Sequence, residues 1–318
     1  MEILDLRHLR SGELEALLEE ETILWQKDLQ WDYSSSADLI KRYVDASALS
    51  GYVALEGGRA VGYCFYVYEN TKGLIGDVFA SDSPRAGATE SQLLTHAIET
   101  LQATPGIRRI EAQLMNLRHQ VPRDFFLRQN LQSFPRRFMF LTLQDGQSAI
   151  PPPVADIRLE PWDGRRVSEA AKLITRAYRG HEDSAISDQY RSLAGAIRFL
   201  DNIVHYPGCG DFDAANSFLA FRKNTSELCG MALSSLVGDR VSHITQLCVD
   251  PDLQGAGVGR TLIGQIIHKL RERGFTAVTL TVTSSNSRAI RLYEQLRFST
   301  LKEFQALAWD APPRTDSL

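Results

Sequence analysis

One glycine-rich stretch decides the fold of this chain: Gln254-Gly255-Ala256-Gly257-Val258-Gly259. It follows the apolar run 244–249 and an Asp250-Pro251 turn, and it precedes an apolar helical pattern that starts at Thr261. A strand, a glycine turn and a helix in this order bring several backbone N–H groups and the positive end of a helix dipole to one point. Glycines at such a turn let an anion approach the backbone and permit positive φ angles. The stretch therefore predicts an anion-binding turn, to which Arg260 adds a positive charge.

Two other glycine motifs do not fit this stretch. A dinucleotide fingerprint needs a third glycine where Arg260 stands, and a P-loop needs a lysine that does not follow here. The pattern that fits is Q-x-x-G-x-G, formed by Gln254, Gly257 and Gly259. It resembles the pyrophosphate loop of the GNAT superfamily of acyl-CoA N-acyltransferases. The alternative is a glycine turn that only closes a strand–helix junction.

A second segment resembles the same family. It follows the family block N-x-x-A-x-x-x-Y-x-x-x-G-F at Asn286, Ala289, Tyr293 and Phe298, with Arg297 in the place of the glycine. Taken alone, a tyrosine on a helical stripe is an ordinary core aromatic. The position of Tyr293 after the glycine loop favours a site residue instead. Because Arg297 replaces a glycine, the turn into the last strand is expected to differ in shape.

The resemblance implies an acetyl-CoA site and gives its residues roles. It implies that the Asn286 side chain bonds the pantetheine arm and that Tyr293, near the thioester sulfur, acts as the general acid. Backbone groups of the strand before the loop would hold the pantetheine, since an unpaired strand edge is costly without a ligand. The expected cofactor-binding residues are Leu247, Cys248, Val249, Gln254, Gly255, Ala256, Gly257, Val258, Gly259, Arg260, Asn286 and Ala289.

The general base is less clear from the sequence. Family members often carry a glutamate on the strand before the loop, where this chain has His243. Histidine accepts a proton near neutral pH, so His243 is the candidate base. The alternatives are a sheet histidine bonded to a cross-strand neighbour, and a water ordered by Gln246. Cys248 is expected to contribute its backbone rather than its thiol.

The acceptor is expected to bind between the first two helices of the second half. His181, Glu182 and Asp183 lie there, and with Gln246 they form the predicted substrate-binding set. The carboxylates could bind an ammonium group or could be solvated loop charges. The leading hypothesis is direct transfer of an acetyl group from acetyl-CoA to a primary amine of a small molecule. The alternatives are a non-catalytic acyl-CoA sensor or scaffold, and a protein or peptide N-acetyltransferase.

The 318-residue chain reads as two copies of one domain. The helical stripe Leu93, Leu94, Ala97, Ile98 and Leu101 recurs 169 positions later, from 93 to 262, as Leu262, Ile263, Ile266, Ile267 and Leu270. We therefore predict a domain at 1–144, a proline-rich linker at 145–155 and a second domain at 156–318. The expected class is α+β (mixed α/β), with a mostly antiparallel sheet and helices on both faces of each domain.

The N-terminal copy lacks the residues of the anion-binding turn. At the same offset, Arg85, Ala88 and Glu90 stand where the C-terminal copy has Gln254, Gly257 and Gly259. A methyl group would crowd a pyrophosphate, and a carboxylate at a helix N-terminus would repel it. Phe126 or Phe125 takes the place of the tyrosine and has no proton to give. The family includes tandem repeats with one degenerate copy, and this chain resembles that arrangement.

Composition sets the remaining expectations. With 43% hydrophobic and 23% charged residues the chain has the composition of a soluble globular protein, and its net charge of −4 gives no reason to expect nucleic-acid binding. The apolar runs are too short for a bilayer and the N-terminus lacks a signal-peptide pattern, so we expect a cytoplasmic protein without a membrane partner. The scattered cysteines Cys64, Cys209, Cys229 and Cys248 are expected to be free thiols, with no metal site.

Overall fold

The computed structural model describes residues 1–117, 123–143, 154–206, 208 and 210–312. These residues form two compact units. Unit 1 contains Met1–Arg136 and the described residues from Glu303 onward, and unit 2 contains Arg137–Lys302.

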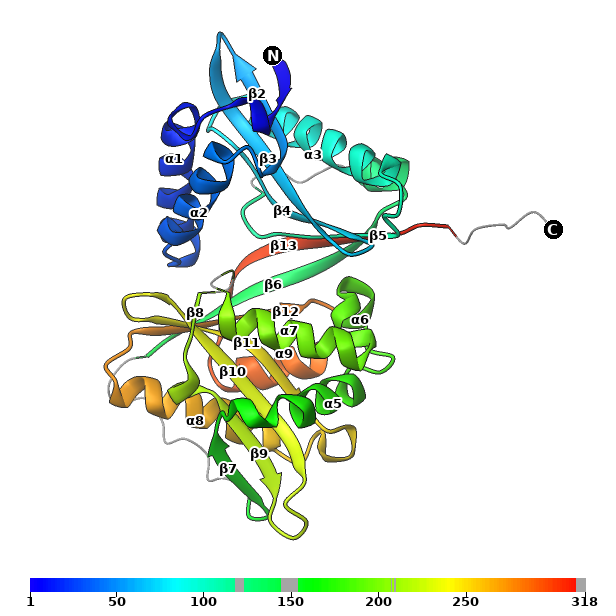
Figure 1. Ribbon diagram of the computed structural model, residues 1–318. Helices are drawn as coiled ribbons and strands as arrows, with labels where there is room; N and C mark the ends of the chain where they lie inside the picture. Colours follow the sequence, from blue (N-terminus) through cyan, green and yellow to red (C-terminus); the bar gives the residue numbers. More distant parts are fainter. Residues whose placement is uncertain (118–122, 144–153, 207, 209, 313–318) are drawn as a thin grey trace, which may run out of the picture. The chain divides into compact units, whose positions relative to one another are not determined.

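Unit 1 is a twisted sheet with helices on both faces (Figure 1). Its elements are β1 (Glu2–Asp5), α1 (Ser11–Leu29), α2 (Ser34–Asp45), β2 (Ser50–Glu56), β3 (Arg59–Glu69), β4 (Lys72–Ala80), α3 (Ala86–Ala103), β5 (Arg109–Leu114), α4 (Arg123–Arg128) and β13 (Ser299–Asp310). The strands follow the order β1-β2-β3-β4-β5-β13. Only β4 and β5 pair in parallel; the other pairs are antiparallel.

Local sequence explains the elements of unit 1. Gly57 and Gly58 have φ of 58° and 78°, and they join β2 to β3 as a two-residue hairpin between the paired residues Glu56 and Arg59. Two consecutive positive φ angles characterise the tight hairpin turn that glycine pairs favour. The predicted stripe of α3 is fully buried against the sheet, from Leu93 to Leu101. Period-3.6 apolar spacing thus placed this helix correctly.

Unit 2 repeats the plan of unit 1. Its elements are β6 (Gln132–Thr142), β7 (Ile157–Pro161), α5 (Val167–Ala177), α6 (Asp183–Ile186), α7 (Leu193–His205), β8 (Asp211–Phe212), β9 (Phe218–Arg222), β10 (Leu228–Gly238), β11 (Val241–Val249), α8 (Val258–Glu272), β12 (Ala277–Thr283) and α9 (Ser287–Gln295). The order is β6-β12-β11-β10-β9-β7, with β8 on β10. One core cluster joins α5 and α7 to one face of the sheet, and another joins α8 and α9 to the opposite face.

One strand of each unit, β13 in unit 1 and β6 in unit 2, comes from the other half of the sequence. β13, which follows α9 in the chain, pairs antiparallel with β5 and buries Leu307 and Trp309 in the core of unit 1. β6, which follows α4, lies next to β12 and buries Met139 and Leu141 in the core of unit 2. The two copies have therefore exchanged their last strands.

This exchange moves the boundaries of the compact units away from those predicted from the sequence. Along the chain, the boundaries between the units fall after Arg136 and after Lys302, whereas the sequence predicted domains at 1–144 and 156–318. Sequence periodicity locates the repeated segments, but it does not reveal which sheet a terminal strand joins. Most of the predicted linker 145–155 lies outside the described residues. The predicted fold class, a mostly antiparallel sheet with helices on both faces in each of two domains, is confirmed.

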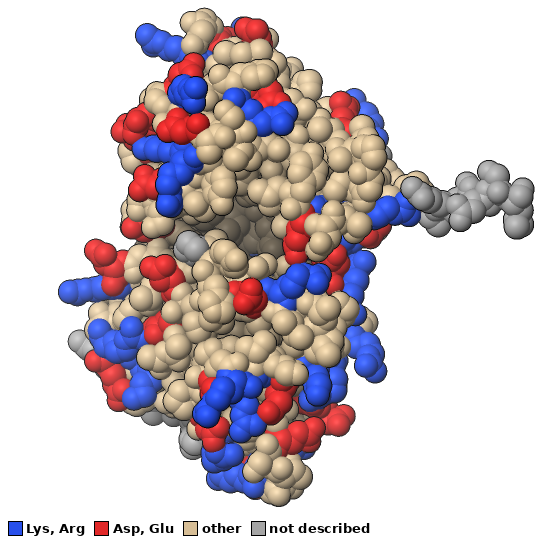
Figure 2. Space-filling view, in the orientation of Figure 1, with Lys and Arg blue, Asp and Glu red and all other residues tan. Residues whose placement is uncertain are grey.

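Charges of both signs are interspersed over the face of each unit shown in Figure 2. Within the described residues, no helix is long and apolar enough to cross a membrane. In the same part of the chain, no group of three or more His, Cys, Asp or Glu side chains could hold a metal ion. Cys64, Cys229 and Cys248 are buried free thiols as predicted, and Cys209 lies outside the described residues.

Candidate active site

The sheet of unit 2 opens into a fork where the glycine loop begins. β11 and β12 pair in parallel only from Val241 with Ala277 to Ile244 with Leu280. An irregularity in the β10–β11 register at Thr245 marks the point where this pairing stops. Residues 246–249 of β11 therefore stay paired with β10 on one side and turn their other edge toward the fork. This is the unpaired strand edge that the sequence predicted before the loop.

The glycine loop itself lies at the end of β11 and starts α8. Gly255 and Gly257 have φ of 88° and 90°, a region that L-residues rarely adopt, and Gly257 is the N-cap of α8. The first N–H groups of a helix have no partner within the helix, and the dipole makes this end positive. Among the described residues, a Cβ at Gly257 would meet only Val154 Cγ2, at 3.1 Å. Gly259 instead faces Leu292 of α9, which indicates a packing role.

A cation that the sequence analysis missed lies over this loop. A Cβ added at Gly255 would come within 2.7 Å of the Arg288 guanidinium, whose other NH group donates to Gln254 Oε1 at 3.0 Å. The predicted cation Arg260 is half-buried, and its Nε has no hydrogen-bond partner among the described residues. Arg288 is the second residue of α9, so the only sequence signal for it was its position just after Asn286.

The second predicted motif forms α9 and its ends. Asn286 is the N-cap of α9, and its Oδ1 accepts from the Ala289 N–H at 3.1 Å. Tyr293 is 7% exposed and its ring lies 5.9 Å from that of Phe298. Arg297 has φ of 71°, so it adopts the left-handed conformation that glycine takes at helix ends. The turn thus keeps a positive φ angle in spite of the substitution.

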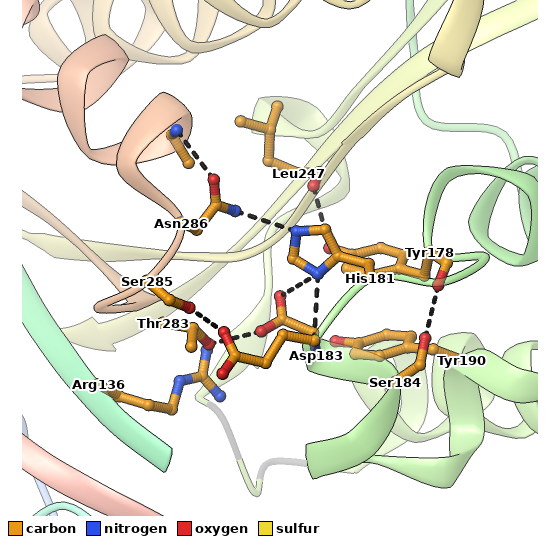
Figure 3. A network of polar contacts seen from close by, with 12 residues as sticks. Arg136, Tyr178, His181, Asp183, Ser184, Tyr190, Leu247, Thr283, Ser285 and Asn286 are labelled. Atoms are coloured by element: carbon orange, nitrogen blue, oxygen red, sulfur yellow. Dashed lines mark hydrogen bonds and ion pairs between the residues drawn. The ribbon is translucent and has the colours of Figure 1, made fainter.

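A short segment, residues 178–186, crosses the mouth of the fork, and we call it the strap (Figure 3). On the β12 side, Asp183 accepts from Thr283 Oγ1 at 2.5 Å, Glu182 accepts from Ser285, and His181 Nε2 lies 3.2 Å from Asn286 Nδ2. On the β11 side, the Tyr178 hydroxyl donates to the Leu247 carbonyl at 3.2 Å. The predicted substrate residues of the strap are therefore brought to the fork, where they are bonded rather than free in solvent.

Gln246 joins two tyrosines beside the same strand edge. Its Nε2 donates to the Tyr178 hydroxyl at 3.0 Å, and its Oε1 accepts from the Tyr190 hydroxyl at 3.3 Å. The two tyrosine rings stack at 4.2 Å with an interplanar angle of 9°. Burial, with the neighbouring Tyr190 and Asp183, raises the pKa of Tyr178 well above its usual value, so its hydroxyl stays protonated. Sequence reasoning did not identify Tyr178, because an aromatic at a helix end carries no distinguishing pattern.

His243 and Cys248 lie in less accessible places. The His243 ring is 6% exposed, bonds Thr279 Oγ1 through Nδ1 at 2.8 Å and stacks on Phe138 at 5.8 Å. This is the cross-strand arrangement that the sequence left open as the alternative to a base. Burial raises the pKa of the Cys248 thiol to about 12, so the thiol stays protonated at neutral pH. A thiol in that state is a poor nucleophile, which agrees with a backbone role for Cys248.

The corresponding turn of unit 1 is built differently. α3 begins at Ala86, so Ala88 and Glu90 lie inside the helix, whereas Gly257 precedes α8. None of the described residues 81–90 has a positive φ angle. Arg85 pairs with Glu56 at 2.7 Å instead of capping a loop. Unit 1 therefore replaces the open glycine turn with an additional helical turn.

Comparison with known proteins agrees with this geometry. Solved structures that cover almost the whole chain share its overall fold. One is a GCN5-related N-acetyltransferase from Sphaerobacter thermophilus, with TM-score 0.69, 14% identity and coverage of 99% of this chain and 98% of that one. Another is a tandem GNAT protein from the clavulanic acid biosynthesis pathway, with TM-score 0.60, 15% identity and coverage of 98% and 99%. These likenesses show the fold.

Sequence comparison identifies the family of the C-terminal copy. Residues 181–298 match the acetyltransferase (GNAT) family, so this segment is a GNAT domain. A mycothiol acetyltransferase from Thermomonospora curvata is 44% identical over 90 residues, which are 28% of this chain and 29% of that protein. A ribosomal protein bS18-alanine N-acetyltransferase from Escherichia coli is 37% identical over 73 residues, 23% of this chain and 49% of that protein. The chain thus spans less than half the length of these curated relatives.

Proposed function

We propose that unit 2 is an N-acetyltransferase that moves the acetyl group of acetyl-CoA to a primary amine of a small molecule. One observation carries the proposal. A glycine turn that starts α8 follows directly on the unpaired edge of β11, inside the segment that matches the acetyltransferase family. In a forked sheet that served only packing, the backbone groups of this edge would have no strand partner to offset the cost of leaving them unpaired.

The residues around the turn fit the diphosphate of a coenzyme A ester. The start of α8 offers N–H donors, and the positive φ of Gly257 keeps them uncovered by a side chain. Arg288 lies over Gly255 with one NH group on Gln254, so a guanidinium can pair with a phosphate there. The diphosphate site proposed here comprises the predicted residues 254–260 together with Arg288. Leu247, Cys248, Val249, Asn286 and Ala289 remain the proposed contacts of the pantetheine arm.

Attack of an amine on a thioester requires a lone pair on the amine, a polarised carbonyl and a protonated leaving thiolate. Acetyl-CoA supplies the thioester. In our proposal the unpaired edge of β11 aligns it, and Tyr293 donates a proton to the departing sulfur. After burial and closer groups, the charge of Tyr293 is a further cause that raises the pKa of Tyr178, which supports placing both tyrosines at one site. Tyr178 and Gln246 would hold the edge of β11 from the acceptor side.

The choice of a small acceptor follows from the strap. Its carboxylates, Glu182 and Asp183, bond Ser285 and Thr283 across the fork, so the acceptor side is narrowed by a bonded segment. A buried or half-buried carboxylate is a natural partner for an ammonium group. The alternative, a protein acceptor, is favoured by one observation, the 37% identity to the ribosomal protein alanine N-acetyltransferase.

A thiol-release assay separates these possibilities. The protein is incubated with acetyl-CoA and a panel of amino sugars, amino acids, polyamines and peptides, while free coenzyme A is followed with a thiol reagent. We expect release with a small amine. Release only with peptides that have a free N-terminal alanine would support the protein acceptor. Tight acetyl-CoA binding without release on any amine would support a non-catalytic sensor.

A further inference from the structure

The fork contains a second histidine, which the sequence analysis assigned only to substrate binding. The side chain of His181 is 33% exposed, and its ring meets that of Tyr178 edge-on at 5.4 Å. Figure 3 shows the ring between Asn286 on one side and Tyr178 and Leu247 on the other. His181 therefore lies at the mouth of the fork and can be reached from solvent.

The hydrogen-bond donors around His181 favour the neutral ring, which is the form that can accept a proton. Asn286 Oδ1 is occupied by the Ala289 N–H, so the amide nitrogen faces His181 Nε2 at 3.2 Å and can only donate. At Nδ1, the Asp183 N–H lies at 3.1 Å and the Asp183 carboxylate at 3.6 Å. A neutral ring has one acceptor nitrogen, so it can accept a hydrogen bond from either the Asn286 amide or the Asp183 N–H. A protonated ring accepts no hydrogen bond. The Asp183 carboxylate is then the group that stabilises the positive charge of the imidazolium.

Asp183 is itself fixed in place. Its carboxylate accepts from Thr283 Oγ1 at 2.5 Å, at the end of β12. The neighbouring Glu182 accepts from Ser285 in the same loop. The strap is thus anchored on the side of the fork opposite to Leu247. His181 is oriented by the Asp183 N–H, and the Asp183 carboxylate beside the ring is fixed by Thr283.

His243 has neither property. It pairs with Thr279 in the closed part of the sheet and packs on Phe138 with 6% exposure. It precedes Leu247 by four residues, roughly 13 Å along an extended strand. A proton leaving an amine in the fork has a shorter path to His181.

We infer that His181, oriented by Asp183, is the catalytic base, an inference that rests on the proposed acetyl transfer. The acceptor enters as an ammonium ion and loses one proton to the imidazole, directly or through one water. The amine lone pair attacks the thioester carbon, the C–S bond breaks, and the thiolate takes the proton of Tyr293. The nitrogen loses its second proton, which restores the tyrosine through solvent, and the imidazolium releases the first. The net products are an amide, coenzyme A and one proton.

The test is a pH profile of kcat/KM for the acceptor that gives the fastest thiol release, combined with calorimetry of acetyl-CoA binding. His181→Gln should lower kcat about 100-fold, remove the acid limb of the profile and leave the acetyl-CoA affinity within about threefold. Imidazole added to His181→Ala should restore part of the rate. Asp183→Asn should lower kcat and leave the acetyl-CoA affinity within about threefold, because the imidazolium formed during turnover loses its carboxylate partner. His205→Gln, which breaks another His–Asp pair on the exposed face of α7, is the matched control and should behave as the wild type.

Three results would overturn the inference, and they separate it from the proposed function. An unchanged acid limb in His181→Gln with active wild-type enzyme would refute the assignment of the base alone. Loss of that limb in His243→Gln, but not in His181→Gln, would assign the base to His243. A wild-type protein that binds no acetyl-CoA, or releases no thiol with any amine, would remove the proposed function and this inference together.

Discussion

At the scale of single residues, the two family-like motifs predicted residues that the structure brings to the fork. Gly257 adopts a positive φ angle, as the glycine pattern predicted, and Asn286 contacts the strap through His181. Arg288 and Tyr178 could not be predicted, because their roles depend on which side of a helix faces the loop or the strand edge. His243 occupies the family's base position in the sequence, yet the structure places it in the paired part of the sheet.

The role of Tyr293 can be tested by removing one oxygen atom. Tyr293→Phe keeps the ring that packs on Phe298, so the fold should be unaffected. We expect kcat to fall about 100-fold, as is typical when a general acid is lost, with little change in acetyl-CoA affinity. Single-turnover thiol release and calorimetry measure the two quantities. A variant with the wild-type rate would show that Tyr293 is only a core aromatic.

At the scale of elements, the two units differ in how two corresponding helices begin, α3 after β4 and α8 after β11. α8 starts after a glycine turn, whereas α3 starts at Ala86 without one. The sequence predicted this difference from single substitutions, because a glycine turn is a local signal. In the sequence, the apolar run 277–283 predicts a strand, which is β12, and Gly57-Gly58 predicts the hairpin between β2 and β3. The sequence also predicts one helix over 188–205. The structure has a 3₁₀ turn at Asp188–Arg191 followed by α7, because apolar spacing alone does not show the break at Ser192.

Unit 1 contains a buried pair of carboxyl groups, Glu21 of α1 and Asp77 of β4. Glu21 accepts from Tyr63 and from Trp25 Nε1, and Asp77 accepts from the Tyr33 hydroxyl at 2.8 Å. Burial raises the pKa of Glu21 well above its usual value, with the charge of Asp77 as the second cause, and burial likewise raises the pKa of Asp77. At the 169 offset Asp77 corresponds to Gln246, so the position beside the fork holds a neutral amide in unit 2 and a carboxyl in unit 1.

These pKa values make the stability of unit 1 depend on pH. Because both are higher in the folded than in the unfolded state, the pair contributes stability below the unfolded pKa and loses it as the pH rises through the folded pKa. We expect the melting temperature of unit 1 to fall as the pH rises above the usual range of carboxyl groups. Glu21→Gln, which needs no proton, should flatten this slope. Differential scanning calorimetry at several pH values measures it, and an equal slope in both proteins would contradict the account.

At the scale of the whole molecule, the exchange of last strands was beyond the reach of the sequence. A terminal strand has the same alternating pattern whichever sheet it joins, because pairing partners are chosen by tertiary packing. In unit 1, Arg109 of β5 bonds Asp310 of β13 at 2.7 Å and Glu111 at 2.5 Å. Arg109 is buried and Asp310 is exposed, and their ion pair helps to fix β13 to unit 1. Each copy of the sequence therefore depends on the other for a complete sheet.

Truncation tests this dependence. A chain that ends at Lys302 loses the side chains of Leu307 and Trp309 from the core of unit 1 and leaves Arg109 without Asp310. Removing buried side chains of this size costs about 3–5 kcal/mol each, and a strand of the sheet is lost as well, so unit 1 should unfold. Amide hydrogen exchange should show rapid exchange in β4 and β5. Protection equal to that of the full chain would mean that β13 is dispensable.

The most direct measurement for the central claim is calorimetry of acetyl-CoA binding to three proteins: the wild type, Gly257→Glu and Ala88→Glu. The last two place the same carboxylate at equivalent positions of the two copies, 169 residues apart from 88 to 257. The account predicts one site per chain, lost in folded Gly257→Glu and unchanged in Ala88→Glu. Two sites per chain, loss of binding in Ala88→Glu, or full affinity in Gly257→Glu would contradict it.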